Sequence, residues 1–312
     1  MSSREGLHTL ADRPRIPLLD DGRTFAVLSA ATFALKAIFV KLAYAAHPID
    51  PLSLLALRMG IALPFFVWLA RRERGAAPEP LTPRLWVGVL LVGFLGYYLS
   101  SLFDFIGLSY ISAGLERLIL FGYPTLVLLI GALWLKQPVR AGAWGALAVC
   151  TLGLAAAVWH DLEQSGDARA VAIGAAWVFA SSVTYALYYL GVGKLAPRVG
   201  STRLAAYGGG ASCVMVLAHY AAAAPPTQLG ELPASVWVYA AAMATISTVL
   251  PIVLLSAAIQ RLGAGRAATF STLGPVLTIA FAWVILGEPF TWQQALGLLL
   301  VVGGVTWLGK ER

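Results

Sequence analysis

Apolar residues fill this chain in stretches that are much longer than a strand and contain no Asp, Glu, Lys or Arg. Eight such stretches are visible, at 85–103, 118–135, 141–160, 170–193, 204–230, 232–260, 267–287 and 289–309. Two more apolar segments carry charges: Lys36 and Lys41 lie in the first, and Arg58 lies in the second. A transmembrane helix needs about 20 mostly apolar residues. The pattern therefore predicts ten spans, at 24–46, 51–70, 85–107, 111–135, 140–159, 170–194, 203–223, 234–258, 266–287 and 291–309.

The composition supports an all-α integral membrane protein. Of the 312 residues, 59% are apolar and only 12% are charged, whereas a soluble domain has about 25% charged residues. Strands of a membrane barrel are about 10 residues long and alternate in polarity, unlike these runs. We expect contact with the lipid bilayer, no nucleic-acid partner, no cofactor and no metal, with the chain functioning as a monomer.

The positive charges predict the topology. With residues 1–23 as a cytoplasmic tail, 17 Lys and Arg lie in inside segments and one, Arg169, lies outside. Cytoplasmic loops of membrane proteins carry such an excess of Lys and Arg. We therefore expect a multi-pass protein of the bacterial inner membrane with both tails, 1–23 and 310–312, in the cytoplasm.

The two halves of the chain repeat each other. A shift of 151 residues superposes Pro124 on Pro275, Leu135 on Leu286 and Pro138 on Pro289. The predicted units are 24–159 and 170–309, with five spans each. Because five is odd, the units must lie in opposite orientations, as in transporters built from inverted repeats around a central cavity.

These links carry a resemblance to a known family. The segments Leu135–Pro138 and Leu286–Pro289 join spans four to five and nine to ten, Ser112-Ala113-Gly114 opens span four, and Arg58 lies in span two. In this order and spacing the chain resembles the drug/metabolite transporter superfamily, EamA type, and is similar to its YddG-type bacterial exporters of amino acids. The resemblance implies ten helices, cytoplasmic tails and a central substrate cavity. The first link has Lys136-Gln137 where the second has Gly287-Glu288, so equal roles for the links are not implied.

Ionisable residues inside spans are costly and mark candidate functional sites. Lys36 is predicted near the midplane, where it either faces a cavity and attracts a carboxylate or packs against backbone. Five others share the outer third of the membrane: Lys41, Arg58, Asp104, Glu116 and Arg117. The last four predict a gate or an ion-pair network, with Arg58 and Asp104 as the expected pair, and for Lys41 and Glu116 the alternative is a side chain that snorkels to the interface.

Aromatic and hydroxyl side chains near span centres predict the wall of a polar, mostly uncharged cavity. Those on the sixth span share one helix face by their spacing. The predicted helix breaks are Pro124 and Pro275, since proline removes a backbone hydrogen bond. Besides Lys36, the candidate cavity residues are Tyr97, Tyr98, Ser101, Trp177, Ser181, Tyr185, Tyr188, Thr248, Ser271 and Thr272; plain helix packing is the alternative for each hydroxyl.

The sequence is typical of a secondary transporter. Only one of four histidines, His219, lies in a span, and no HExxH pattern or pair of aspartates within the spans suggests an intramembrane enzyme. No GxxxxGK[ST] motif indicates direct use of ATP. We expect export of small metabolites, most of all aromatic or neutral amino acids, by alternating access. A channel-like uniporter and a transporter of another metabolite class stay open as alternatives.

Overall fold

The computed structural model describes residues 22–73, 80–136, 141–225, 227–263, 267 and 270–310, and within these ranges the regular structure is helical throughout. The first repeat comprises α1 (Gly22–Ala46), α2 (Pro51–Arg72), α3 (Pro83–Gly93), a π-helical turn η1 (Phe94–Leu99), α4 (Ser100–Leu108), α5 (Ala113–Phe121), α6 (Tyr123–Leu135) and α7 (Ala141–Ser165). The second comprises α8 (Ala168–Val199), α9 (Ser201–Ala223), the short α10 (Thr227–Gly230), α11 (Ala234–Ala244), η2 (Thr245–Val249), α12 (Leu250–Leu262), η3 (Phe270–Thr272), α14 (Leu273–Phe281), η4 (Ala282–Leu286) and α15 (Trp292–Lys310).

Nine helical segments of the described chain are long and apolar enough to cross a membrane. They correspond to nine of the ten expected spans, mostly within two residues at each end. The expected span 266–287 is represented by a shorter apolar helix, Leu273–Leu286. The predicted ends at 159, 194 and 258 are too early. The helix α7 continues to Ser165 through mostly polar residues, α8 continues past Lys194 to Val199, and α12 continues to Leu262.

The same irregularities recur at equivalent places in both halves. The π-helical turns η1 and η2 begin at Phe94 and Thr245, 151 residues apart. Lys136 and Gly287, also 151 residues apart, both end a helix in the left-handed conformation. Lys136 is the only residue other than glycine with positive φ in the described chain. The breaks at Pro124 and Pro275 are equivalent too, each near the start of a helix segment, α6 and α14.

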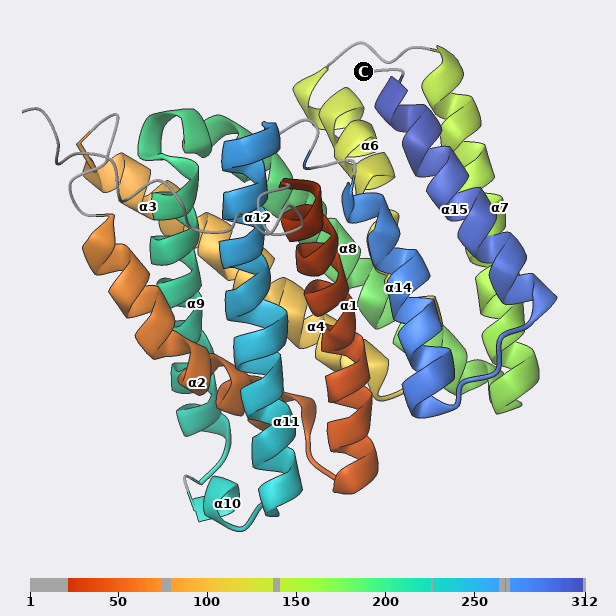
Figure 1. Ribbon diagram of the computed structural model, residues 1–312, viewed down its shortest axis with the longest axis horizontal. Helices are drawn as coiled ribbons and strands as arrows, with labels where there is room; N and C mark the ends of the chain where they lie inside the picture. The colour runs from red at the N-terminus through yellow and green to blue at the C-terminus, as the bar shows by residue number, and fades with distance from the viewer. Residues whose placement is uncertain are drawn as a thin grey trace, which may run out of the picture.

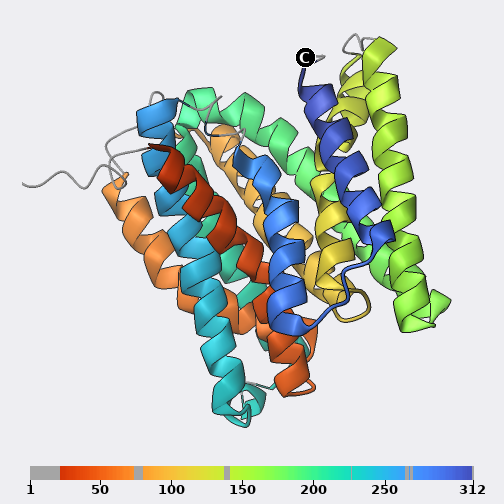
Figure 2. The same cartoon turned by 45° about the vertical axis from the view of Figure 1, so that its right-hand side comes forward.

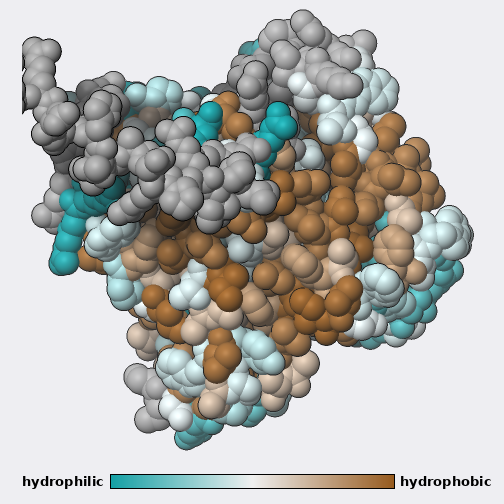
Figure 3. All heavy atoms as spheres, viewed as in Figure 1, coloured by the Kyte–Doolittle hydropathy of each residue, from teal (hydrophilic) through white to brown (hydrophobic). Residues whose placement is uncertain are grey.

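The helix contacts follow the repeat. The helix α1 packs against α12 and α14, and its counterpart α8 packs against α4 and α6. The equivalent helices α2 and α9 pack against each other, as do α7 and α15. Figures 1 and 2 show α7 and α15 side by side at one edge of the bundle, while α1, α4 and α8 cross its centre. Apolar side chains cover much of the middle of the face in Figure 3, as expected for contact with lipid.

Candidate functional site

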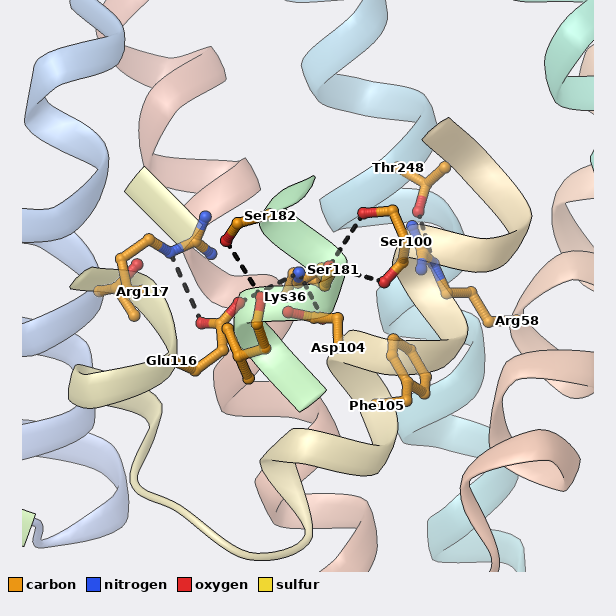
Figure 4. A network of polar contacts seen from close by, with 12 residues as sticks. Lys36, Arg58, Ser100, Asp104, Phe105, Glu116, Arg117, Ser181, Ser182 and Thr248 are labelled. Carbon is orange, nitrogen blue, oxygen red and sulfur yellow. Dashed lines mark hydrogen bonds and ion pairs between the residues drawn. The ribbon is translucent and has the colours of Figure 1, made fainter. Parts of the chain in front are cut away.

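Four charged residues of the spans converge at the centre of the bundle, where α1, α4 and α5 meet (Figure 4). The Lys36 ammonium lies 2.7 Å from Asp104 Oδ2 and 3.4 Å from Glu116 Oε1. Arg117 Nε lies 3.8 Å from Glu116 Oε2. We call these four residues the charged cluster. Each has a side chain at most 7% exposed, so the four groups neutralise one another where water cannot.

Local structure explains why these side chains meet. Ser112 caps α5 by accepting a hydrogen bond from the Leu115 N–H. The helix therefore begins at Ala113, and Glu116 and Arg117 fall in its first turns. The π-helical turn η1 precedes α4 and changes the direction in which Asp104 points. Inserting one residue rotates the following helix by about 100°.

Arg58 does not form the expected ion pair with Asp104, and this part of the prediction is wrong. Arg58 Nε donates to Thr248 Oγ1 at 3.0 Å, and the guanidinium lies over the ring of Phe105 at 5.6 Å. Thr248, in the π-helical turn η2, in turn donates to the carbonyl of Met243, which lies in the preceding helix α11. Asp104 is paired with Lys36 instead. The expected pairing of Arg58 with Asp104 rested on their similar depth in the membrane. Depth does not determine how each helix is rotated about its axis, and this rotation decides which side chains face each other.

Several polar atoms at this centre lack hydrogen-bond partners in the described chain. Among donors these are Arg58 Nη1 and Arg117 Nε and Nη2, and among acceptors Asp104 Oδ1 and Glu116 Oε2. The Arg117 guanidinium is supported by the ring of Phe33, 5.2 Å away. Buried polar atoms are normally paired, so this centre has unused capacity for a ligand with both donor and acceptor groups.

The predicted polar face of α8 contacts the segment formed by η1 and α4. Trp177 packs against Phe103, with ring centroids 5.2 Å apart. Ser181 is fully buried and bonds the hydroxyl and carbonyl oxygens of Ser100, at 3.0 and 2.8 Å. The Tyr188 hydroxyl donates to that of Tyr97 at 3.3 Å. Two of these contacts, at Trp177 and Ser181, are therefore helix-packing contacts in this state.

Five tyrosines form a second group of side chains beside this face of α8. Tyr185 and Tyr188 are stacked 5.4 Å apart, and Tyr123 lies 5.0 Å from Tyr185. Tyr123 also contacts Tyr189, at 4.6 Å. We call Tyr97, Tyr123, Tyr185, Tyr188 and Tyr189 the tyrosine cluster; Tyr123, which precedes Pro124, and Tyr189, in the sixth span, are also among the aromatic residues that the sequence suggests for a cavity wall.

The remaining candidates lie elsewhere. Tyr98 points away from the tyrosine cluster to His219, with Oη 2.8 Å from Nδ1. Ser101 is half-buried on α4, and Thr272 is half-buried in the turn η3. The side chain of Ser271 lies outside the described residues. Pro124 and Pro275 stand in the first turns of α6 and α14, as the predicted helix breaks require.

A second polar arrangement holds the turn between α4 and α5. Asp161 of α7 accepts from the Ser112 N–H and hydroxyl, at 2.9 and 2.6 Å. Glu288, in the link between η4 and α15, accepts from the Ala113 N–H at 2.9 Å. Lys41 donates to the carbonyl of Ile111 at 3.0 Å. We call Lys41, Asp161 and Glu288 the end clamp; it joins both repeats, and the sequence did not identify it because its members are distant along the chain.

Burial raises the pKa of the Glu288 carboxyl above its ordinary value, although the Ala113 N–H and the Lys41 charge act in the opposite direction. The clamp thus holds a carboxyl whose charge depends on pH. No group of three or more His, Cys, Asp or Glu side chains arranged to hold a metal ion occurs in the part of the chain that the structure describes.

Comparison with known proteins gives a consistent result. The model of the EamA-like transporter family matches twice, at residues 22–159 and 172–309. The uncharacterized transporter YcbK of Bacillus subtilis strain 168 is 33% identical over 289 residues, which cover 90% of this chain and 88% of YcbK. The uncharacterized transporter YyaM of the same organism is 24% identical over 284 residues, with 90% of each chain covered. A solved structure titled "Crystal structure of protein" has the same fold, with a TM-score of 0.61, 18% identity, and coverage of 93% of this chain and 98% of that one.

Proposed function

The chain belongs to the EamA-like transporter family, and we propose that it exports a small zwitterionic metabolite by alternating access through a ten-helix bundle of two inverted repeats. The observation that carries this proposal is the charged cluster with its unused donors and acceptors at the bundle centre. Intramembrane ionisable residues of this kind mark substrate and ion pathways. The segment Leu273–Leu286, with η3 before it, is taken as the tenth crossing.

The repeats support alternation between two states. Each repeat has five crossings, so the second begins on the side of the membrane opposite to the first. The hydrogen bond between Arg58 and Thr248 joins the repeats, and so does the contact between Ala113 and Glu288. If each repeat adopted the packing that the other has now, contacts between the repeats such as that of Ala113 with Glu288 would break. The centre of the bundle would then open to the opposite side of the membrane.

The two clusters suit the two ends of an amino acid. A carboxylate would engage unpartnered guanidinium nitrogens of either Arg117 or Arg58, which lie on opposite sides of Lys36 in Figure 4, and an ammonium would engage Asp104 Oδ1. The tyrosine cluster offers ring faces and edges to an aromatic or other apolar side chain. These features favour aromatic or neutral amino acids as the substrate class.

The charge distribution of the sequence favours cytoplasmic tails. In that orientation the end clamp lies on the outer side, and its closed contacts correspond to a state closed to the outside. We further infer that one chain is the transport unit, because each chain carries both of the repeats that alternation requires.

Uptake into proteoliposomes tests this function. The purified protein is reconstituted and exposed to a panel of labelled amino acids, with and without a pH gradient. We expect saturable uptake of aromatic or neutral amino acids that is absent from protein-free vesicles. Uptake of no member of the panel above the protein-free level would refute the proposed substrate class.

A further inference from the structure

We propose that Asp104 and Glu116, on either side of Lys36, form a proton-binding site, and that Glu116 is the group that gains and loses the proton coupled to transport. The coupling to transport rests on the proposed function, whereas proton binding by these two acids does not. The proton site itself is a property of the protein at rest and is tested separately below.

One ammonium serves two carboxyl groups, and it serves them unequally. Lys36 Nζ is 2.7 Å from Asp104 but 3.4 Å from Glu116. Asp104 therefore holds the short, charge-assisted contact, and Glu116 has only a long one. The Glu116 side chain has no exposed surface, so water cannot solvate its charge in place of the ammonium.

The two acids also face each other. Both carboxyl groups contact the same ammonium, Lys36 Nζ, at 2.7 and 3.4 Å, and each keeps one buried oxygen without a hydrogen-bond partner in the described chain. A hydrogen bond between the two acids requires that one of them carries a proton, because two carboxylates have acceptors alone. Adjacent carboxyl groups that share one proton are known from aspartic proteases, where two like charges close together cannot both ionise.

The other charged group facing Glu116 does not complete its pairing. Arg117 Nε is 3.8 Å from Glu116 Oε2, close enough for an ion pair but beyond hydrogen-bond distance. In the described chain this oxygen therefore has no hydrogen-bond partner. The guanidinium is instead held over Phe33. Three polar side chains on helices packed against α5 bond elsewhere: Asp161 to Ser112, Ser182 to the carbonyls of Ile119 and Val178, and Thr278 to the carbonyl of Ala34. The buried amide of Gln294, on α15, lies against Gly114 of α5.

The proton step is a simple transfer. The Glu116 carboxylate takes up one proton from the aqueous side to which the centre is open and becomes a carboxylic acid. Its O–H then donates to Asp104, whose second oxygen keeps its contact with Lys36. When the centre opens to the other side, loss of this proton restores the carboxylate. One positive charge thus crosses the membrane for each such cycle.

Infrared difference spectroscopy tests the site without any transport. Spectra of the purified protein in lipid nanodiscs are compared between mildly acidic and mildly alkaline pH. We expect the C=O stretching band of a buried carboxylic acid in the wild type, its loss in Glu116→Gln, and its retention in the control Glu231→Gln, which removes an exposed acid. In Glu116→Asp, a second variant that keeps the acid, the band should shift. A band that is the same in the wild type and in both Glu116 variants, or absent from the wild type, would overturn the proposal.

Proteoliposomes test the coupling. The ratio of uptake rates with and without a pH gradient should exceed one in the wild type and fall to one in Glu116→Asp or Glu116→Gln. A wild-type ratio of one would refute coupling while leaving transport in place. A lack of transport of every solute would instead refute the proposed function, and the infrared result would still stand.

Discussion

At the scale of single residues, the centre of the bundle is organised by mutual neutralisation of buried charges. A lone charged side chain at this depth costs about 2.5–3.5 kcal/mol. The sequence identified all members of the charged cluster as candidates, because charges in apolar spans are conspicuous. It paired Asp104 with the wrong cation, because the direction of Lys36 and Arg58 depends on helix rotation and packing that no local pattern encodes.

The contact between Lys36 and Asp104 should dominate the stability of this centre. Removing one partner of a buried ion pair costs about 3–5 kcal/mol, since the other charge is left unpaired. We expect Lys36→Met to lower the free energy of unfolding by about this amount, and Asp104→Asn added to it to restore part of the loss. The measurement is denaturant unfolding in detergent, with the exposed Lys194→Met as the matched control. Strictly additive losses in the double variant would show that the two side chains are not coupled.

Glu288 should make the stability depend on pH. Burial raises the pKa of its carboxyl, so the folded protein keeps this proton to a higher pH than the unfolded chain does. The stability contributed by Glu288 is therefore greatest below the ordinary value of 4.5 and falls as pH rises from there through the raised pKa. We expect the difference in unfolding temperature between wild type and Glu288→Gln to change with pH in this range. Two parallel curves would contradict the account.

At the scale of elements, the ends of most spans were predictable, those of α7, α8 and α12 being exceptions, and the irregularities inside the spans were not. Apolar length and flanking charge predict where a helix such as α2 or α9 begins and ends. No sequence pattern predicts the π-helical turns η1 and η2. Their recurrence 151 residues apart indicates that both repeats use the same device to direct the polar residues that follow, Asp104 in one and Thr248 within the other.

The contact between α7 and α15 depends on glycines that allow close approach. A Cβ on Gly304 would lie 2.5 Å from Cys150 Sγ and 2.9 Å from the Ala146 carbonyl, whereas a Cβ on Gly303 would meet nothing within 4 Å. We expect Gly304→Ala to lower stability by about 1–3 kcal/mol through overpacking. Gly303→Ala, its neighbour and control, should leave stability unchanged or slightly raised. Thermal unfolding in detergent measures both, and equal effects would refute the packing argument.

At the scale of the whole molecule, composition and periodicity were sufficient for the class of protein and its repeated plan. The prolines and leucines that reveal the repeat recur at a constant spacing of 151 residues, which can be recognised without knowledge of the packing. The end clamp could not be predicted from the sequence, because Asp161, Glu288 and Lys41 come from three distant segments that only the fold brings together.

The orientation in the membrane can be checked by cysteine labelling. Gln164 and Gly309 are exposed, and the predicted topology places them on opposite sides of the membrane. The native Cys150 and Cys213 are buried. A membrane-impermeant thiol reagent added outside intact cells should label Gln164→Cys and leave Gly309→Cys unlabelled. Because the reagent does not reach cytoplasmic segments, labelling of Gly309→Cys and not of Gln164→Cys would show the opposite topology.

The central claim is that this chain is a carrier, and counterflow tests it most directly. Proteoliposomes loaded with a high concentration of the unlabelled amino acid identified by the panel are diluted into a trace of the labelled one. An alternating-access carrier predicts transient accumulation of label inside above its external concentration, followed by decay, because the inner pool drives exchange. A monotonic rise to equal concentrations, as a channel would give, would contradict the account.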